Sequence, residues 1–430
     1  MRTFHVFILS ALALVLVAAT AIAAGTGEVT ATVETPVLFD DDEGGNADAD
    51  DPAIWVNRAD SGASLVLGTV KDGGLRVYDL AGNEVQAIAP PPAPGPDDEP
   101  GRFNNVDIVH GIRLAGKKVD LAVVTDRGRD HIRFYRIDGG TVPLVDVTAA
   151  NVPFVFSADQ AEVNEATTAY GIATYKAGSG AAYVVTSRRH RTELALLRIR
   201  PRADGTVGYV RVASTSLPST FALPGGGSWT PCEDPGELPQ VEGMVVDPSR
   251  GLLFVAQEDV GIWVVTLWGQ HFGPRALIDR VREFGIPAEF DEVEEECVLD
   301  EEADPGFGGE HLSADAEGLT IYRDSHGPGY LFASSQGSDE FVVYGNRGLG
   351  GYRATVSVVE GGGIDGVQES DGAAVTSTPL GDAFPHGLLA VHDGNEEPGG
   401  VDGDGEPRDA TNFKFVPVER FLEAAGLNGR

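Results

Sequence analysis

The chain has 430 residues and a formal net charge of −35, from 66 acidic and 31 basic side chains. So negative a charge argues against binding to nucleic acid or to an anionic membrane surface. Clustered carboxylates instead favour cation binding, because a metal ion removes their mutual repulsion. The only two cysteines are Cys232 and Cys297, which excludes a disulfide-rich framework and a four-cysteine zinc site.

The N-terminus is expected to direct export. Arg2 precedes an apolar run from Phe7 to Ala24, and the run ends in the small-x-small sequence Ala21-Ile22-Ala23 of a secretory signal peptide. An uncleaved membrane anchor is the alternative, and the shortness of the run argues against it. We therefore expect a signal peptide at 1–24, an N-terminal linker at 25–44, and a secreted or periplasmic protein that does not associate with the membrane after cleavage.

From there the chain is predicted to be all-β. Short β-rich runs separated by Gly, Pro, Asp and Asn lie at 64–68, 75–79, 121–125, 132–137, 182–186 and 194–200. Helical periodicity is confined to the C-terminus, where residues 417–426 are expected to form one short helix.

The strands repeat as six similar units. Each unit opens with a polar residue before an apolar strand, and a second strand about 15–25 residues later ends in a charged or amide residue. The openings are at Asp51, Asp107, Tyr170, Glu242, Glu317 and Asp371. The second strands end at Lys71, Arg127, Arg188, Glu258, Gln336 and Asp393. Six units at this spacing predict one domain over residues 45–426, an all-β six-bladed β-propeller with four-stranded antiparallel blades and a central channel; a β-sandwich is the competing architecture.

A propeller brings such strand ends together around one mouth of its channel. A ring of buried carboxylates, Lys and Arg is costly unless it holds cations and an anionic ligand together. Calcium suits carboxylate and carbonyl oxygens, and Lys and Arg suit phosphate. A metal-bound water of lowered pKa would then attack phosphorus.

Other phosphate chemistries do not fit. Residues 111–118 resemble a P-loop, but Lys118 stands where Ser or Thr must hold magnesium, and the segment leads into a strand rather than a helix. The sequence has no G-x-S-x-G elbow and no H-E-x-x-H motif.

The octapeptide D-A-D-D-P-A-I-W at residues 48–55 resembles the signature of the β-propeller phytases. Further similar segments follow in family order at 104–108, 242–244, 258–259, 317–322, 334–337 and 412–414. The resemblance implies a calcium-dependent hydrolase of phosphoric monoesters of the 3-phytase type. Its cofactor would be several Ca²⁺ ions, and it would convert calcium phytate (myo-inositol hexakisphosphate) stepwise to lower inositol phosphates. We expect a monomer with a small polyanionic substrate.

The resemblance also implies roles for single positions. Contacts to the cleaved phosphate correspond to Lys71, Arg127, Tyr170 and Arg188. Ligands of the catalytic calcium cluster correspond to Glu242, Glu258, Asp315, Glu317 and Asp371, with Glu258 also preparing the water. Asp50, as a metal ligand, and Gln336, as a substrate-binding residue, line the same site, with Asp365 as a further calcium ligand there. Structural calcium sites between blades correspond to Asp51, Asn105 and Asp107. For each carboxylate the alternative is a strand-end turn residue bonded to the backbone.

Two features depart from the family pattern. Arg189 stands where smaller bacterial members usually carry Glu, so the basic loop 188–191 is expected to add substrate binding through Arg189. Insertions at 224–240, with Cys232, and at 291–304, with Cys297, flank the fourth blade. We expect a disulfide between them; surface loops with free thiols are the alternative. Residues 402–406 are expected to form a flexible acidic loop.

Two further functions remain open from the sequence. A calcium-dependent lactonase or esterase would share the carboxylates but would not need Lys71, Arg127 and Arg188 around one site. A non-enzymatic calcium-stabilised binding propeller would tolerate the same fold.

Overall fold

A computed structural model describes residues 25–39, 47–294, 296–323, 329–345, 351–401, 405 and 407–427. The expected signal peptide, part of the expected linker and most of the acidic loop 402–406 lie outside the described residues. Within the described ranges, helices are too short to cross a membrane.

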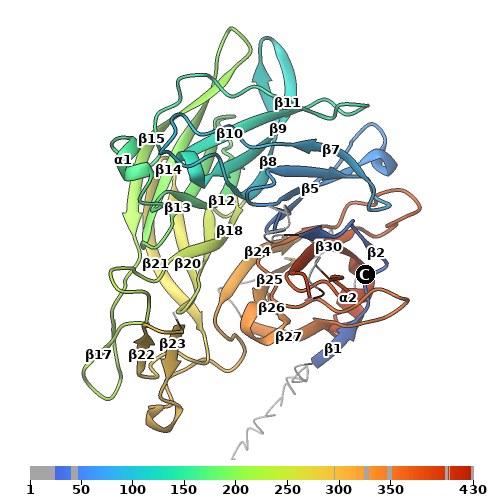
Figure 1. Cartoon of the computed structure of the whole chain (residues 1–430). Coiled ribbons are helices and arrows are strands. Elements are labelled where there is room, and N and C mark those ends of the chain that lie inside the picture. Colours follow the sequence, from blue (N-terminus) through green and yellow to red (C-terminus); the bar gives the residue numbers. More distant parts are fainter. Residues whose placement is uncertain are drawn as a thin grey trace, which may run out of the picture.

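Six antiparallel sheets form a ring of blades, which confirms the six-bladed β-propeller (Figure 1). Blade 1 contains β4 (Pro52–Trp55), β5 (Leu65–Thr69), β6 (Leu75–Tyr78) and β7 (Glu84–Ile88). Blade 2 contains β8 (Phe103–Leu114), β9 (Lys117–Asp126), β10 (His131–Ile137) and β11 (Leu144–Asp146). Blade 3 contains β12 (Ala169–Lys176), β13 (Ala182–Arg188), β14 (Glu193–Pro201) and β15 (Val207–Ser216).

The remaining blades follow the same order. Blade 4 contains β18 (Val241–Asp247), β19 (Leu252–Gln257), β20 (Gly261–Trp268) and β21 (His271–Arg280). Blade 5 contains β24 (Ala316–Tyr322), β25 (Tyr330–Ser335), β26 (Glu340–Gly345) and β27 (Gly351–Val358). Blade 6 contains β28 (Ala373–Thr376), β29 (Leu388–Asp393) and β30 (Ala410–Pro417). Short 3₁₀ turns lie at Ser61–Ala63, Arg127–Arg129, Glu301–Ala303 and Gln336–Ser338, and helix α1 spans Gln160–Val163.

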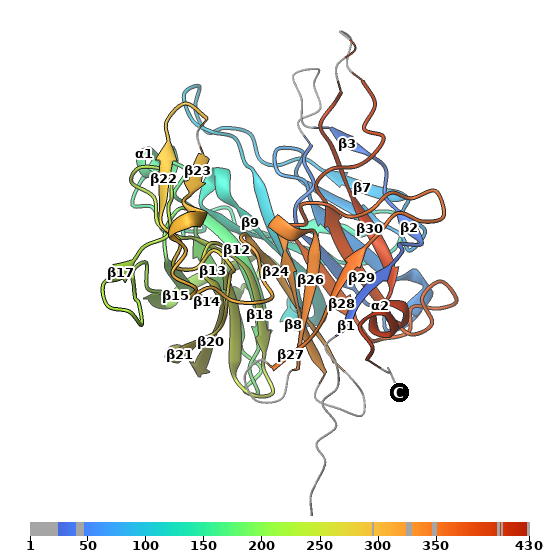
Figure 2. The ribbon, with the colours of Figure 1, turned by 90° about the horizontal axis from the view of Figure 1, so that it is seen from below.

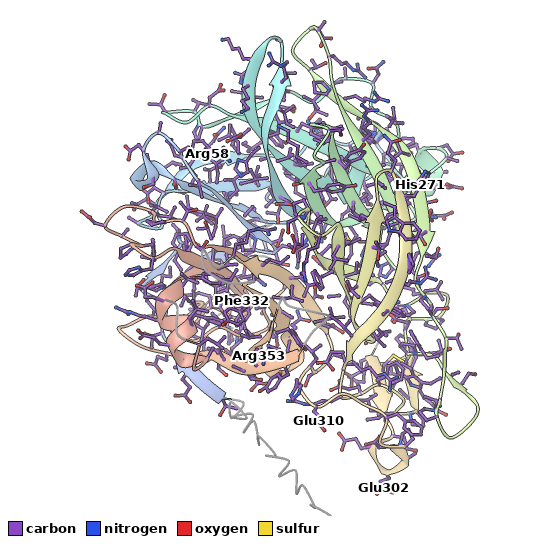
Figure 3. All side chains as sticks on the ribbon, turned by 180° about the vertical axis from the view of Figure 1, so that it is seen from behind. Arg58, His271, Glu302, Glu310, Phe332 and Arg353 are labelled. Atoms are coloured by element: carbon purple, nitrogen blue, oxygen red, sulfur yellow. A yellow bond between two sulfur atoms is a disulfide. The ribbon has the colours of Figure 1, made fainter. Side chains whose placement is uncertain are left out.

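The two ends of the chain close the ring together. Strand β2 (Val33–Glu34) pairs with β30 and completes blade 6, and β3 (Leu38–Phe39) pairs further along the same strand. Strand β1 (Gly25–Val29) adds to blade 5 in parallel with β27. The predicted C-terminal helix is α2 (Val418–Ala424), and its buried Phe421 packs against Phe332 with ring centroids 4.8 Å apart. Phe332 is labelled in Figure 3. These pairings leave few open strand edges where the ring closes.

The core lies between adjacent blades. Phe413 of β30 has no exposed surface and packs against Tyr78 of blade 1, with ring centroids 6.0 Å apart. A Cβ at Gly68 of β5 would lie 2.2 Å from the Phe413 ring, so only glycine fits opposite this side chain. Phe413 therefore fills the seam where the last blade meets the first.

The two insertions form a small substructure beside blade 4. The hairpin of β16 (Phe221–Ala222) and β17 (Ser228–Trp229) overlaps the first insertion, and the hairpin of β22 (Ala288–Asp291) and β23 (Glu296–Leu299) overlaps the second. The structure joins Cys232 to Cys297 in a disulfide, with Cα atoms 5.9 Å apart. Trp229 packs against Phe284 with ring centroids 4.5 Å apart and the ring planes tilted by 50°. The β22–β23 hairpin stands out beyond the ends of the blades (Figure 2).

Phe413→Ala should lower the free energy of unfolding by about 3–5 kcal/mol, because the truncation leaves a cavity at the closing seam. The matched control is Trp268→Ala, which removes an aromatic side chain that is 61% exposed and should change stability by about 0.5 kcal/mol or less. Urea unfolding of both variants measures the difference, and equal losses would contradict this account of the seam.

Candidate functional site

Three buried carboxylates meet at one mouth of the central channel. Glu242 and Glu317 are the second residues of inner strands β18 and β24, and Glu258 directly follows β19. One oxygen of each lies within 4.8 Å of the others, and the three residues are only 3%, 4% and 7% exposed, respectively. Among the described residues, Glu258 Oε1 and Glu317 Oε2 have no hydrogen-bond partner. Buried carboxylate oxygens without partners are suited to hold a cation.

Glycines bring these strand starts together. The residue after each of four openings is glycine, and an added Cβ there would collide with the next blade. At Gly171 and Gly243 it would lie 2.1 Å from the carbonyl oxygens of Glu242 and Glu317. At Gly318 and Gly372 the nearest atoms, in the Asp371–Ala373 and Asp51 backbones, would be 2.8 and 2.6 Å away. The polar residues that open these inner strands therefore lie where the backbones of adjacent blades are in direct contact.

An irregularity of strand pairing recurs at the same places. The pairing register of the inner strand shifts between Phe103 and Val106, Ala169 and Ile172, Val241 and Met244, and Ala316 and Leu319. A bulge re-aims the side chains that it contains. Because of the repeated bulge, the side chains of Tyr170, Glu242 and Glu317 need not alternate between the two faces of the sheet as they would in a regular strand.

Basic side chains lie directly against the acidic ones. Lys71 Nζ contacts Asp48 and lies 3.9 Å from Asp50 Oδ2 and 3.8 Å from Asp371 Oδ2. Arg127 Nη1 donates to Asn104 Oδ1 at 2.7 Å, and Asn104 Nδ2 donates to Glu242 Oε1 at 2.8 Å.

Two more of the expected residues join this group. The Arg127 guanidinium lies over the Tyr170 ring at 5.8 Å. Gln336 Nε2 donates to Asp371 Oδ1 at 2.7 Å. The structure therefore brings Lys71, Arg127, Tyr170 and Gln336 to the same mouth as the carboxylates.

Arg188 is placed differently from the expectation. Its Nε donates to the Thr167 carbonyl at 2.7 Å, Nη1 lies 3.7 Å from Glu193, and the guanidinium sits over the Phe156 ring at 5.7 Å. These contacts tie it to the outer side of the basic loop. Burial and the neighbouring Arg127 lower the pKa of Arg189, and Tyr170 acts in the opposite direction, so Arg189 interacts electrostatically with two residues of the site.

Asp365 also lies apart from the expected place. It contacts buried Lys414 and shares a second acidic group with Glu34 and Glu396, whose ligand oxygens lie within 4.8 Å of one another. Lys414 Nζ also contacts Asp393 Oδ2 at 2.7 Å. Asp365 is therefore corrected from a neighbour of the central carboxylates to a member of this separate cluster.

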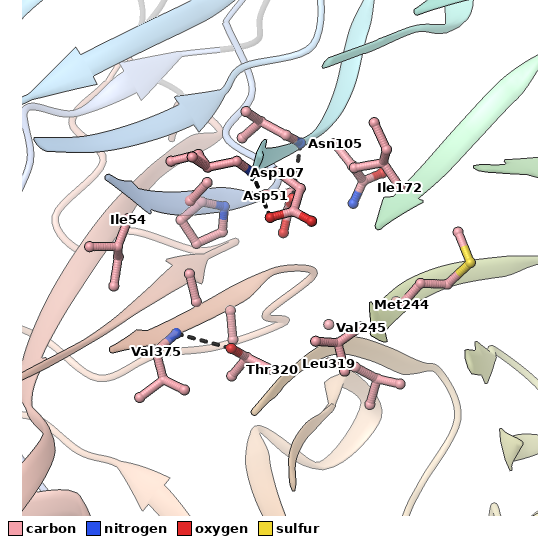
Figure 4. Close-up of a pocket in the computed structure, with 18 residues that line it drawn as sticks. Asp51, Ile54, Asn105, Asp107, Ile172, Met244, Val245, Leu319, Thr320 and Val375 are labelled. Atoms are coloured by element: carbon pink, nitrogen blue, oxygen red, sulfur yellow. Dashed lines mark hydrogen bonds between the residues drawn. The ribbon is translucent and has the colours of Figure 1, made fainter. Parts of the chain in front are cut away.

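Asp51, Asn105 and Asp107 line a cavity of about 150 Å³ inside the channel (Figure 4). Asp51 Oδ2 accepts a hydrogen bond from Val106 N at 3.0 Å, and Asp107 Oδ2 accepts from Thr174 N at 2.6 Å. Both carboxylates thus accept hydrogen bonds from the backbone of a neighbouring blade. Bonding to the backbone is the alternative role that the sequence analysis gave for each carboxylate. Their role as structural calcium ligands stays a prediction.

Some contacts of the site were missed by sequence reasoning. Asn104 and Asp48 lie within the segments that resemble the family, at 104–108 and 48–55. This location in the sequence is the signal that could have identified them as site residues. Glu233 and Gln240 belong to an insertion outside the repeats. Burial and the neighbouring Asp259 raise the pKa of Glu233 to about 9, which places this insertion residue against the acidic group.

Burial dominates the electrostatics of the cluster. It raises the pKa values of Asp50, Glu258 and Glu317 well above normal, and neighbouring carboxylates raise them further. Burial and Asp259 raise the pKa of Asp315 to about 7. For Asp371, burial outweighs the opposing Lys71 and brings the pKa to about 6. A bound cation would offset this penalty by stabilising the ionised carboxylates.

The protein stripped with a chelator should lose stability as pH rises. Folding raises the pKa values of Asp371 and Asp315 above those of the unfolded chain, so their contribution is complete in acid and is lost as pH rises through about 6 and 7. The Tm should fall between about pH 5 and about pH 7.5, and calcium should raise it more at the higher pH. Differential scanning fluorimetry measures both, with magnesium as the control cation. A Tm of the stripped protein that rises over this interval would contradict the prediction.

Fold and site together define a six-bladed propeller with buried carboxylates and basic groups at one mouth of its channel. The phytase family model matches residues 3–216 and 285–428, and a 3-phytase of Bacillus subtilis (strain 168) is 31% identical over 405 residues, covering 93% of this chain and 86% of that protein. The chain belongs to the phytase family, which confirms the predicted resemblance and makes it a phosphatase-type hydrolase.

Solved structures share the fold more distantly. The β-propeller domain of Cps50 (Swd1) from Myceliophteria thermophila has a TM-score of 0.37 and 12% identity, covering 85% of this chain and 83% of that chain. A virginiamycin B lyase of Staphylococcus aureus has a TM-score of 0.38 and 10% identity, covering 89% and 99%. At these TM-scores the likeness carries no functional argument.

Proposed function

We propose that this protein is an exported, calcium-dependent 3-phytase that releases phosphate from myo-inositol hexakisphosphate. One observation carries the proposal: a group of three buried carboxylates, two of which have an unpartnered oxygen, lies at the same mouth as Arg127 and Lys71. The acidic group supplies a place for cations and the basic groups supply a place for phosphate. Family membership supplies the phosphomonoester chemistry.

The carboxylates have the chemistry of a calcium site. Those that would hold the ions are Asp50, Glu242, Glu258, Asp315, Glu317 and Asp371. When bound, calcium supplies a Lewis acid and a water of lowered pKa. Glu258 and Glu317 each keep a buried oxygen free of protein partners for this purpose. Glu258 is the proposed acceptor of the proton that the attacking water loses.

The basic side chains would bind and orient the phosphate. Arg127 uses Nη1 to contact Asn104, so its fixed guanidinium plane keeps other N–H groups for phosphate oxygens. Lys71 adds a point charge on the side of Asp371. Arg127 lowers the pKa of Arg189, as does burial, and two neighbouring cations favour an anion bound between them. The Tyr170 hydroxyl lies beside Glu242 and can donate to a phosphate oxygen or to that carboxylate.

The proposal also covers which phosphate is attacked, export of the protein and its oligomeric state. Attack at the 3-phosphate follows the name of the Bacillus relative. Export follows the signal-like sequence at 1–24, and the net charge of −35 suits a small cation-bound substrate rather than nucleic acid. We propose a monomer, since the blades and both chain ends complete the ring within one chain.

Arg127→Ala and Glu258→Gln should each lower kcat/KM for calcium phytate by about 10²-fold or more, because the first removes a phosphate-binding cation and the second removes the carboxylate that accepts the proton of the attacking water. Released phosphate is measured with and without chelator, beside a lactone and an aryl ester as substrates. Exposed Arg200→Ala and Glu289→Gln are the matched controls and should retain activity. Ester or lactone hydrolysis without phosphate release would reject the function, and full activity of both site variants would reject the site.

Arg189→Ala should lower kcat/KM by about tenfold or more, whereas Arg188→Ala should change it by about threefold or less. The reason is that Thr167, Glu193 and Phe156 hold Arg188 outside the site. Steady-state kinetics well below the Tm of each variant separate activity from stability. The opposite order of effects would restore Arg188 as the phosphate contact.

A further inference from the structure

An arm formed by residues 231–240 connects the disulfide with the candidate site. It begins beside Cys232, which is bonded to Cys297, and it ends where β18 begins. The arm lies between the two stretches that match the family model. It docks on the basic loop: His190 Nδ1 lies 2.6 Å from Glu237 Oε2, and Leu238 N donates to the His190 carbonyl at 3.2 Å.

The last residue of the arm, Gln240, bridges the basic loop and the acidic cluster. Its Oε1 accepts a hydrogen bond from His190 N at 2.8 Å, and its Nε2 donates to Glu258 Oε2 at 2.8 Å. Its backbone carbonyl also accepts from Glu258 N at 3.2 Å. Because Oε2 of Glu258 is engaged in this way, the buried oxygen without a partner is Oε1.

The bridge is held rigidly from both sides. The carbonyl of Pro239 accepts a hydrogen bond from Gln257 Nε2 at 2.8 Å, and Gln257 Oε1 accepts from Trp263 Nε1 at 3.0 Å. Gln257 has no exposed surface. On the other side, His190 has φ = 56°, in the left-handed region that is costly for a residue with a side chain. Such a backbone persists only where neighbouring contacts fix it.

We propose that Gln240 is a positioning residue, which sets the place of Glu258 and of the loop carrying Arg189 relative to one another. The amide orients the carboxylate so that one oxygen faces the cation cluster, and the same amide fixes the loop that presents a guanidinium to phosphate. This inference rests on the proposed function. Loss of the amide frees the Glu258 carboxylate to rotate and loosens the strained turn at His190.

The test compares Gln240→Met with Gln86→Met. Methionine keeps the length and flexibility of glutamine but makes neither hydrogen bond. Gln86 is the matched control, since its amide also donates and accepts, bonding Leu144 O at 3.0 Å and Leu144 N at 2.9 Å between the outer strands of blades 1 and 2. Gln240→Asn is a second variant, whose shorter amide cannot meet both partners.

Four quantities are measured on each full-length protein: Tm, calcium affinity of the chelator-stripped protein by isothermal titration calorimetry, and kcat and KM for calcium phytate. Gln240→Met should weaken calcium binding by about tenfold and lower kcat by about tenfold, with a smaller change in KM. Gln240→Asn should change both in the same direction. Gln86→Met should lose a similar amount of Tm and keep both values.

The outcomes separate this inference from the proposed function. If Gln240→Met lowers only Tm, as Gln86→Met does, Gln240 is merely structural and the inference is wrong while the function stands. If the wild-type protein releases no phosphate but Gln240→Met still weakens calcium binding, the positioning of Glu258 stands and the proposed function is wrong.

Discussion

The structure depends on the close approach of inner-strand backbones at one mouth of the channel. Four of the six polar opening residues are followed by a glycine, and the space of the missing side chain is taken by the backbone of the next blade. Any larger residue there would push two blades apart. Because the backbones that carry these carboxylates are in contact, the carboxylates cannot move apart. The distances between them are therefore set by the ring of inner strands. The site is therefore as rigid as the fold that carries it.

This rigidity has an electrostatic cost. The carboxylates are buried near one another, and burial raises their pKa values by more than Lys71 and Arg127 lower them. A fold designed for stability alone would replace such a group by apolar side chains. The cost is offset where a ligand of opposite charge is bound, and a site with both signs of charge can bind a cation and an anion in contact. The proposed complex of a metal ion with a polyanion would meet both requirements.

Sequence reasoning was most successful where structure repeats. The six units, the inner-strand openings and the C-terminal helix followed from pattern, because equivalent strands of a propeller occupy equivalent positions. It was less successful in turns. Arg188 and Arg189 are adjacent at the end of one strand, and which of them faces the site depends on contacts with Thr167 and Phe156 that no pattern encodes. Asp365 was misplaced because the turn that carries it leads toward Lys414. Gln240 was missed because it belongs to no repeat.

The closing seam has a consequence for how the chain acquires its shape. Strand β2 pairs with β30, so residues at the two ends of the chain, such as Thr35 and Phe413, are hydrogen-bonded across a sequence separation of 378 residues. Contacts between such distant residues form late, because a long loop must be closed before they stabilise anything. Strand β2 therefore lacks its partner β30 until the C-terminal segment has been synthesised. The ring of blades can close only once β30 is present, and the shorter chain that precedes it is an open arc of blades.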